Sequence, residues 1–210
     1  MKTRGNLIVL SGFAGVGKGT VLRSLFETRE GYAYSVSATT RSPRPGEVDG
    51  VHYFFVTKER FEEMIENDEL LEHASYVGNY YGTPRDYVEK KLDEGFDVIL
   101  EIEVQGALNI KKKVPDAILI YMLPPAAKVL YERLRHRGTE TDEVIAKRMK
   151  RAAEEAQSVS KYDYIIVNRD ADECAAQLDT LIRAQRQSVR SNLPFIEKLQ
   201  EEFRELSEKE

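Results

Sequence analysis

The most constraining feature of the sequence is a glycine-rich stretch, residues 11–20, that directly follows an apolar run at residues 7–10. The run predicts a buried strand, and the stretch predicts a loop that leads into a helix near Gly17. Glycines allow successive backbone N–H groups to turn toward one anion, the start of the helix adds the positive end of its dipole, and Lys18 adds a mobile charge. The sequence therefore predicts a site for the phosphates of a nucleoside triphosphate.

The loop departs from the common phosphate-loop pattern at the position after the lysine. That pattern places Ser or Thr there to bind Mg²⁺, whereas here Gly19 precedes Thr20. Mg²⁺ gives up water reluctantly, so we expect water and phosphate oxygens to hold most of it, and we assign no residue as a metal ligand. The alternative is a turn that only connects strand to helix. The residues expected to bind the nucleotide are Gly12, Phe13, Ala14, Gly15, Val16, Gly17, Lys18, Gly19 and Thr20.

Strand-like runs alternate with helical segments along the chain. This alternation predicts an α/β fold in which a parallel sheet carries helices on both faces, and the phosphate loop at the start of the chain makes it one of the P-loop NTPase type. No fixed-period repeat is present. The predicted strands lie at residues 7–10, 34–37, 97–102, 117–122 and 164–167.

Two stretches interrupt this alternation. Residues 38–90 are rich in Pro, Gly and Tyr and predict a small mixed α+β insert, and residues 138–158 are charged and predict a helical lid. We expect the remaining segments, 1–37, 91–137 and 159–210, to form the core together with a C-terminal helix.

The composition limits the classes of partner. A chain of 210 residues suits one domain with inserts, and its single cysteine, Cys174, excludes an internal disulfide. The net charge of −5 provides no general basic surface for nucleic acid or an anionic membrane. No apolar run approaches the roughly 20 residues that span a bilayer, and the first residues lack the apolar core of a signal peptide. We therefore expect a cytoplasmic enzyme with small-molecule substrates.

The insert carries a recognisable signature. Residues 39–47 read Thr-Thr-Arg-Ser-Pro-Arg-Pro-Gly-Glu, and residues 49–54 read Asp-Gly-Val-His-Tyr-Phe. With the phosphate loop and further motifs at residues 71–74, 78–83, 101–106 and 137–141, the chain resembles the guanylate kinase family over about residues 6–182. The resemblance implies a P-loop nucleoside monophosphate kinase that transfers the γ-phosphate of ATP, bound with Mg²⁺, to GMP or dGMP. Residues 38–90 would then bind the nucleoside monophosphate.

The residue types in the insert suit a nucleoside monophosphate. Arg41 and Arg44 can form planar, bidentate contacts to a phosphate, and the hydroxyls of Tyr53 and Tyr81 can donate to its remaining oxygens. Guanine presents N1–H beside an exocyclic amine, so a carboxylate such as Glu72 accepts from both, whereas it repels the N1 acceptor of adenine. Solvated arginines, packed tyrosines and a helix-capping glutamate are the plainer alternatives.

The resemblance implies further contacts on the acceptor side. Ser37 and Thr83 would complete the reading of the base, and Glu47 would steady the arginines. Glu101 and Glu103 occupy two acidic positions at which Asp is frequent in the family. Their longer side chains leave open whether Glu103 contacts the base or reaches Mg²⁺ through water.

A dense basic cluster at residues 131–138 ends a predicted helix. In the kinases that the chain resembles, arginines matching Arg133, Arg137 and Arg148 close over the triphosphate, and Asn168 lies near the donor adenine. Phosphoryl transfer needs positioning and charge more than covalent help, so we expect no general base and an in-line transfer. The expected catalytic residues are Lys18, Arg41, Arg133, Arg137 and Arg148. The alternative for the cluster is a helix end that complements its own dipole.

Rival functions use the same residues. One is a kinase for another phosphorylated acceptor, such as AMP or a ribose bisphosphate, and the other is an inactive module that binds phosphorylated peptides. Residues 192–210 predict a charged amphipathic helix, which we expect to pack on the chain's own core. Its alternative is a surface for self-association, so the chain is a candidate homo-oligomer.

Overall fold

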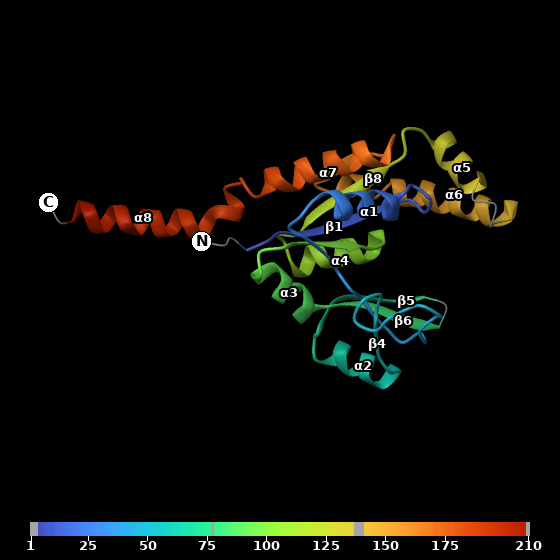
Figure 1. Cartoon of the computed structure of the whole chain (residues 1–210), viewed down its shortest axis with the longest axis horizontal. Helices are drawn as coiled ribbons and strands as arrows, with labels where there is room; N and C mark the ends of the chain where they lie inside the picture. The colour runs from blue at the N-terminus through green and yellow to red at the C-terminus, as the bar shows by residue number, and fades with distance from the viewer. Residues whose placement is uncertain (1–3, 77, 137–140, 209–210) are drawn as a thin grey trace.

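The computed structural model describes residues 4–76, 78–136 and 141–208 and is built around a five-stranded parallel sheet (Figure 1). At its centre, Val9 is in register with Leu100 on one side and Leu119 on the other. The predicted parallel sheet is therefore confirmed. Its strands, in spatial order, are β2 (Tyr32–Tyr34), β7 (Asp97–Glu101), β1 (Leu7–Gly12), β8 (Ile118–Leu123) and β9 (Tyr164–Val167).

The second strand lies earlier in the chain than predicted. Tyr34 is its last residue, in register with Ile99, and the N–H of Ser35 still donates to the Ile99 carbonyl at 3.0 Å. The chain then leaves this sheet and enters a second one at Ala38. The strand predicted at residues 34–37 therefore overlaps β2 only at Tyr34, because residues 35–37 connect the two sheets.

Helices cover both faces of the parallel sheet, as predicted (Figure 1). Side chains alternate along β1, so Ile8 and Leu10 face one layer of helices while Leu7 and Val9 face the other. The first layer contains α1 (Lys18–Thr28), α5 (Ala127–His136), α6 (Asp142–Ala156) and α7 (Ala171–Gln185). The second contains α3 (Arg85–Asp93) and α4 (Val104–Lys113). A 3₁₀ turn, η1 (Val159–Lys161), separates α6 from β9.

The insert forms a four-stranded mixed sheet of its own, which confirms the predicted α+β character. In spatial order the strands are β4 (Phe54–Phe55), β3 (Ala38–Thr39), β6 (Asn79–Pro84) and β5 (Leu70–Tyr76). Phe61 and Met64 of α2 (Lys58–Glu66) pack on this sheet against Leu70. Because this small core is separate from those of the parallel sheet, the insert is organised around its own packing.

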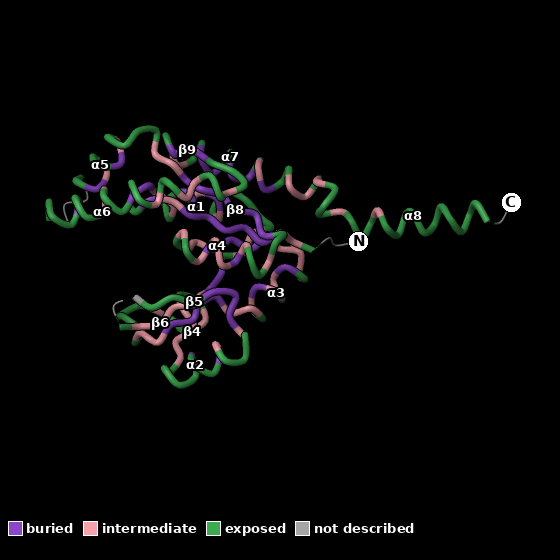
Figure 2. The backbone as a smooth tube through the Cα atoms, turned by 180° about the vertical axis from the view of Figure 1, so that it is seen from behind, coloured by how far each residue is buried: buried purple, intermediate pink, exposed green. Residues whose placement is uncertain are grey.

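The C-terminal helix does not pack on the body of the protein. After the 3₁₀ turn η2 (Arg190–Asn192), α8 (Leu193–Ser207) runs outward from the body of the protein, and none of its residues is buried (Figures 1 and 2). Phe195, Phe203 and Leu206 are each more than 60% exposed. The prediction that this segment packs on the chain's own core is wrong. No helix among the described residues is long and apolar enough to cross a membrane.

The buried carboxylate of Asp97 connects the segment that leads into β1 with the end of α7. Asp97, at the start of β7, accepts hydrogen bonds from the backbone N–H of Asn6 at 2.7 Å and from Arg186 Nε at 2.8 Å. The Asp97 side chain is only 3% exposed, so these donors replace water around its charge. Arg186 Nη2 also donates to the Gly95 carbonyl at 3.0 Å. The interaction fixes the end of α7 against the start of the sheet.

We predict that Asp97→Ala lowers the free energy of unfolding by about 2–3 kcal/mol, because it leaves the half-buried Arg186 and a backbone N–H without their acceptor. Chemical denaturation with a matched Lys198→Ala control measures this. Lys198 is exposed on α8 and should change stability by less than about 0.5 kcal/mol. Equal stabilities of the two variants would contradict the assignment.

Candidate active site

The glycine-rich loop has the backbone conformation that its sequence predicts. Gly15 and Gly17 have φ angles of 85° and 101°, in the left-handed region that favours glycine, and Gly17 caps α1. A Cβ atom on Gly12 would lie 2.6 Å from the Met122 carbonyl oxygen. Phe13 is buried, with its ring 5.3 Å from that of Tyr121. The loop is thus held tightly against β8 and opens toward the start of α1.

The carbonyl of Val16 anchors this loop to two distant elements. It accepts hydrogen bonds from Asn168 Nδ2 at 2.8 Å and from Arg133 Nη1 at 3.0 Å. Arg133 Nη2 donates in turn to the Asn168 carbonyl at 3.0 Å. The structure therefore brings two of the predicted site residues, Arg133 and Asn168, together at the loop. The Arg133 guanidinium contacts backbone carbonyls there.

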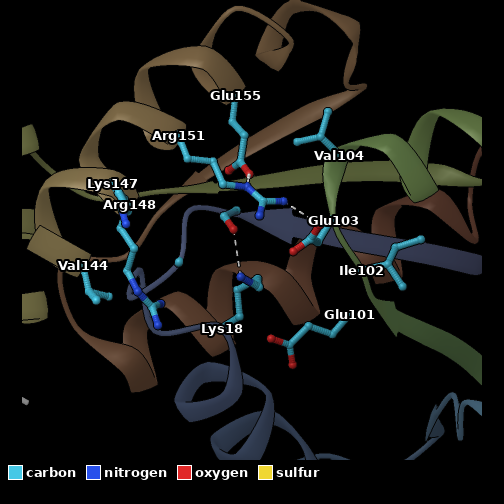
Figure 3. Close-up of a pocket in the computed structure, with 12 residues that line it drawn as sticks. Lys18, Glu101, Ile102, Glu103, Val104, Val144, Lys147, Arg148, Arg151 and Glu155 are labelled. Atoms are coloured by element: carbon cyan, nitrogen blue, oxygen red, sulfur yellow. Dashed lines mark hydrogen bonds and ion pairs between the residues drawn. The ribbon is translucent and has the colours of Figure 1, made fainter. Parts of the chain in front are cut away.

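A cavity of about 520 Å³ lies between the loop, the carboxyl end of β7 and one face of α6 (Figure 3). Lys18 Nζ donates to the Gly12 carbonyl at 2.8 Å, which keeps the ammonium group beside the loop. Positive side chains from α6 and carboxylates from the β7–α4 connection face the same space (Figure 3). Its lining residues are Gly12, Ala14, Lys18, Glu101, Ile102, Glu103, Val104, Val144, Lys147, Arg148, Arg151 and Glu155.

Three of the charged lining residues were missed by the sequence analysis: Lys147, Arg151 and Glu155. They share one face of α6 with Val144 and Arg148, because positions three, four or seven apart stack along a helix. That spacing is visible in the sequence and could have extended the prediction beyond Arg148. What it could not show is that this face is turned toward the phosphate loop.

The predicted phosphate-binding residues of the insert lie together. Arg41 donates to both carboxylate oxygens of Glu47, at 2.9 and 2.8 Å, and the backbone N–H of Arg44 donates to the same carboxylate at 2.7 Å. These hydrogen bonds lower the pKa of Glu47 to about 2, and the largest effect comes from Arg41. The Arg41 guanidinium lies 5.4 Å from the ring centroid of Tyr53, whose ring is 6.1 Å from that of Tyr81. The Arg44 side chain is exposed.

The predicted base-reading pair is buried between the insert and α4. Glu72 on β5 is 8% exposed, and Thr83 Oγ1 on β6 donates to its Oε1 at 2.9 Å. Burial raises the pKa of Glu72, while the Thr83 hydrogen bond and the charge of Lys113 act in the opposite direction. A Cβ atom on Gly106 would lie 3.1 Å from Glu72 Oε2. This glycine lets α4 pack close to the carboxylate.

The other predicted residues occupy varied places. Ser37 is half-buried on the connection between the sheets, and its carbonyl accepts from the Phe54 N–H at 2.9 Å. Glu101 accepts a long hydrogen bond, 3.5 Å, from the Tyr34 hydroxyl. Gly19 and Thr20 are exposed on the first turn of α1. Arg137 lies outside the described residues.

Comparison with known proteins explains this combination of a phosphate loop and an arginine-rich insert. The sequence model described as Guanylate kinase matches residues 4–185. The chain belongs to the guanylate kinase family. The family resemblance inferred from the motifs is confirmed, and α8 lies beyond the matched residues.

Relatives and a solved structure agree with the assignment to guanylate kinase. The chain is 53% identical over 189 residues to a guanylate kinase of Lactococcus lactis, covering 90% of this chain and 92% of the relative. It is 56% identical over 186 residues to one from Streptococcus pneumoniae, covering 88% and 89%. A crystal structure of guanylate kinase from Anaplasma phagocytophilum matches with a TM-score of 0.69 at 34% identity, covering 89% of each chain. Guanylate kinases phosphorylate GMP with ATP, so the chain is an ATP:GMP phosphotransferase.

Proposed function

We propose that this guanylate kinase binds ATP at the phosphate loop and GMP or dGMP in the insert, and transfers the γ-phosphate in line between them. The main support is that the cavity over the loop reaches α4, whose Gly106 lies against the buried Glu72. The two substrates would therefore approach each other across the start of this helix. In this scheme, residues 38–90 bind GMP, residues 138–158 form the lid, and the other segments form the core.

In this proposal, catalysis depends mainly on positively charged side chains that stabilise the transition state. The transferring phosphoryl group spreads negative charge over its oxygens, and fixed cations stabilise that charge without covalent chemistry. Lys18 and Arg148 line the cavity and would contact the triphosphate, together with Arg137. Arg133 would act through the loop, because its guanidinium holds the Val16 carbonyl.

The acceptor phosphate would be bound by Arg41, Arg44, Tyr53 and Tyr81. The bidentate pairing with Glu47 holds the Arg41 guanidinium in one orientation before GMP arrives, so less side-chain entropy is lost on binding. Since the pKa of Glu47 is lowered to about 2, this carboxylate stays ionised throughout the neutral range. Arg41 therefore keeps its orientation at physiological pH.

Magnesium is part of the proposal as an ion that arrives with ATP. The described residues contain no group of three or more His, Cys, Asp or Glu side chains that could hold a metal ion. The cavity offers the carboxylates of Glu101 and Glu103, which suit an ion bound through water and phosphate oxygens. When bound, Mg²⁺ neutralises charge on the transferring phosphates.

A cytoplasmic location remains a prediction from the sequence.

We predict that Lys18→Ala lowers kcat for ADP formation from Mg-ATP and GMP at least about 10²-fold, through loss of preorganised charge. Acceptor assays with GMP, dGMP, AMP, CMP and UMP, and an acceptor-free blank, measure the reaction. Strong preference for GMP and dGMP supports the proposed function. Equal use of AMP would favour the rival nucleotide kinase, and no turnover with any acceptor would favour the phosphopeptide-binding module.

We predict that Glu72→Gln raises KM for GMP roughly tenfold to a hundredfold, because a neutral amide cannot accept from both guanine donors. The wild-type KM for GMP should also rise as the pH falls through the raised pKa of Glu72, which lies above 4.5. Protonation is easier in the folded state, so this group's contribution to stability is present below pH 4.5 and is lost as the pH rises through the raised pKa.

The control for this experiment is KM for ATP, measured over the same pH range. It should remain flat in both proteins if Glu72 reads only the acceptor. An unchanged preference for GMP over AMP in Glu72→Gln would rule out the base-reading role.

We also infer that α8 joins two copies of the chain. Its apolar positions Ile196, Leu199, Phe203 and Leu206 follow the 3–4 spacing of a helix-pairing face and are left uncovered by the body. Residues 193–208 carry five glutamates and two basic residues, a balance that disfavours an anionic membrane. The face can instead pair with its own copy.

Light scattering should therefore show an oligomer for the wild type and a monomer for Phe203→Glu, with kcat per chain unchanged. Glu201→Gln, at an exposed position off this apolar face, serves as the control and should remain oligomeric. A monomeric wild type at the highest concentration used for kinetics would exclude this pairing.

A further inference from the structure

Arg151 connects the lid helix to the acceptor side of the active site. Its guanidinium donates from Nε to Glu155 Oε1 at 2.8 Å and from Nη2 to Glu103 Oε2 at 2.6 Å (Figure 3). Glu155 lies one turn further along α6, and its side chain is only 18% exposed. Glu155 therefore orients Arg151 within its own helix, while Glu103 is the contact that leaves α6.

Glu103 occupies a connecting position in the active site. It is the N-cap residue of α4 and lies two residues beyond Glu101 at the end of β7. Three residues later, Gly106 packs against the Glu72 carboxylate. The Arg151–Glu103 pair therefore joins the lid helix to the same helix end that borders the proposed base pocket.

Arg148 gives this connection a consequence for the donor phosphates. It lies three residues before Arg151 on the same face of α6, and both line the cavity above the phosphate loop (Figure 3). Residues three apart are neighbours on one helix face, so a displacement of α6 shifts both side chains. A contact that holds Arg151 against Glu103 therefore also holds Arg148 over the loop.

We propose that Arg151 is a positioning residue whose ion pair with Glu103 holds α6 across the cavity, so that Arg148 faces the phosphates. The inference rests on the proposed function and adds a partner for Glu103 that the sequence did not predict. It also explains why a glutamate is suited to this position. An aspartate is shorter by one carbon–carbon bond, about 1.5 Å, and would lose the hydrogen-bonding distance to Arg151.

The expected effects are modest and depend on salt. The Arg151 and Glu103 side chains are 52% and 72% exposed, and exposed ion pairs contribute little in water. We therefore expect Arg151→Ala to raise KM for ATP about three- to fivefold, with the preference for GMP over AMP unchanged. The difference should vanish near 1 M salt, where the screening length falls to about 3 Å.

The decisive experiment is a double-mutant cycle with Arg151→Ala and Glu103→Asp. If the two side chains act only through their ion pair, each single variant raises KM for ATP to a similar extent, and the KM of the double variant is no higher than that of either. Lys150→Ala is the matched control, because this neighbouring lysine of α6 is exposed and does not line the cavity. Its KM for ATP should equal that of the wild type.

Other outcomes would overturn the inference. Additive effects, or loss of kcat in Arg151→Ala with no effect of Glu103→Asp, would mean that Arg151 acts without Glu103. A changed preference for GMP over AMP in Glu103→Asp would make Glu103 a base contact. Lower thermal stability with unchanged KM values would leave the pair a purely structural role. Absence of GMP-dependent turnover in both the wild type and Lys150→Ala would refute the proposed function, and this result is distinct from those that refute the role of the Arg151–Glu103 pair.

Discussion

The shared carbonyl of Val16 is the interaction on which the rest of the site depends. Asn168 from the end of β9 and Arg133 from α5 both donate to this one oxygen, and so fix the phosphate loop to two elements that are remote in the sequence. A loop with two glycines in left-handed conformations would otherwise sample many states. Anchoring it preorganises its N–H groups before a nucleotide binds, which lowers the entropic cost of binding.

The helix α4 links the two halves of the active site. Its N-terminal end follows β7 directly, carries Glu103 at its cap, and lies against Glu72 through the glycine at position 106. The insert keeps a small core of its own, and Leu71 of β5 also packs into the core beneath the parallel sheet, beside α4. This arrangement suits a kinase of the guanylate kinase family, in which donor and acceptor phosphates must meet with little error in position.

Short, contiguous patterns predicted the local backbone structure around the phosphate loop correctly. The strand, glycine-rich loop and Lys18 lie within residues 7–18, and their geometry follows from local backbone rules. Glu72 and Thr83 were each expected at the base, but their hydrogen bond to each other is visible only in the structure. The second strand was misplaced because propensity does not show where the chain crosses to another sheet. Likewise, the amphipathic pattern of α8 required a partner for its apolar face but did not say which one.

The phosphate loop, the parallel α/β fold and the family could be inferred from the sequence, because periodicity and motif spacing are properties of residues close together along the chain. Which distant charges meet became visible only in the folded structure. Arg133 and Val16 are 117 residues apart, and Arg151 and Glu103 are 48 apart. Such contacts depend on how helices pack across the sheet, and a difference of one helical turn would remove them. The structure also shows α8 projecting from the body, a position that its amphipathic pattern did not predict.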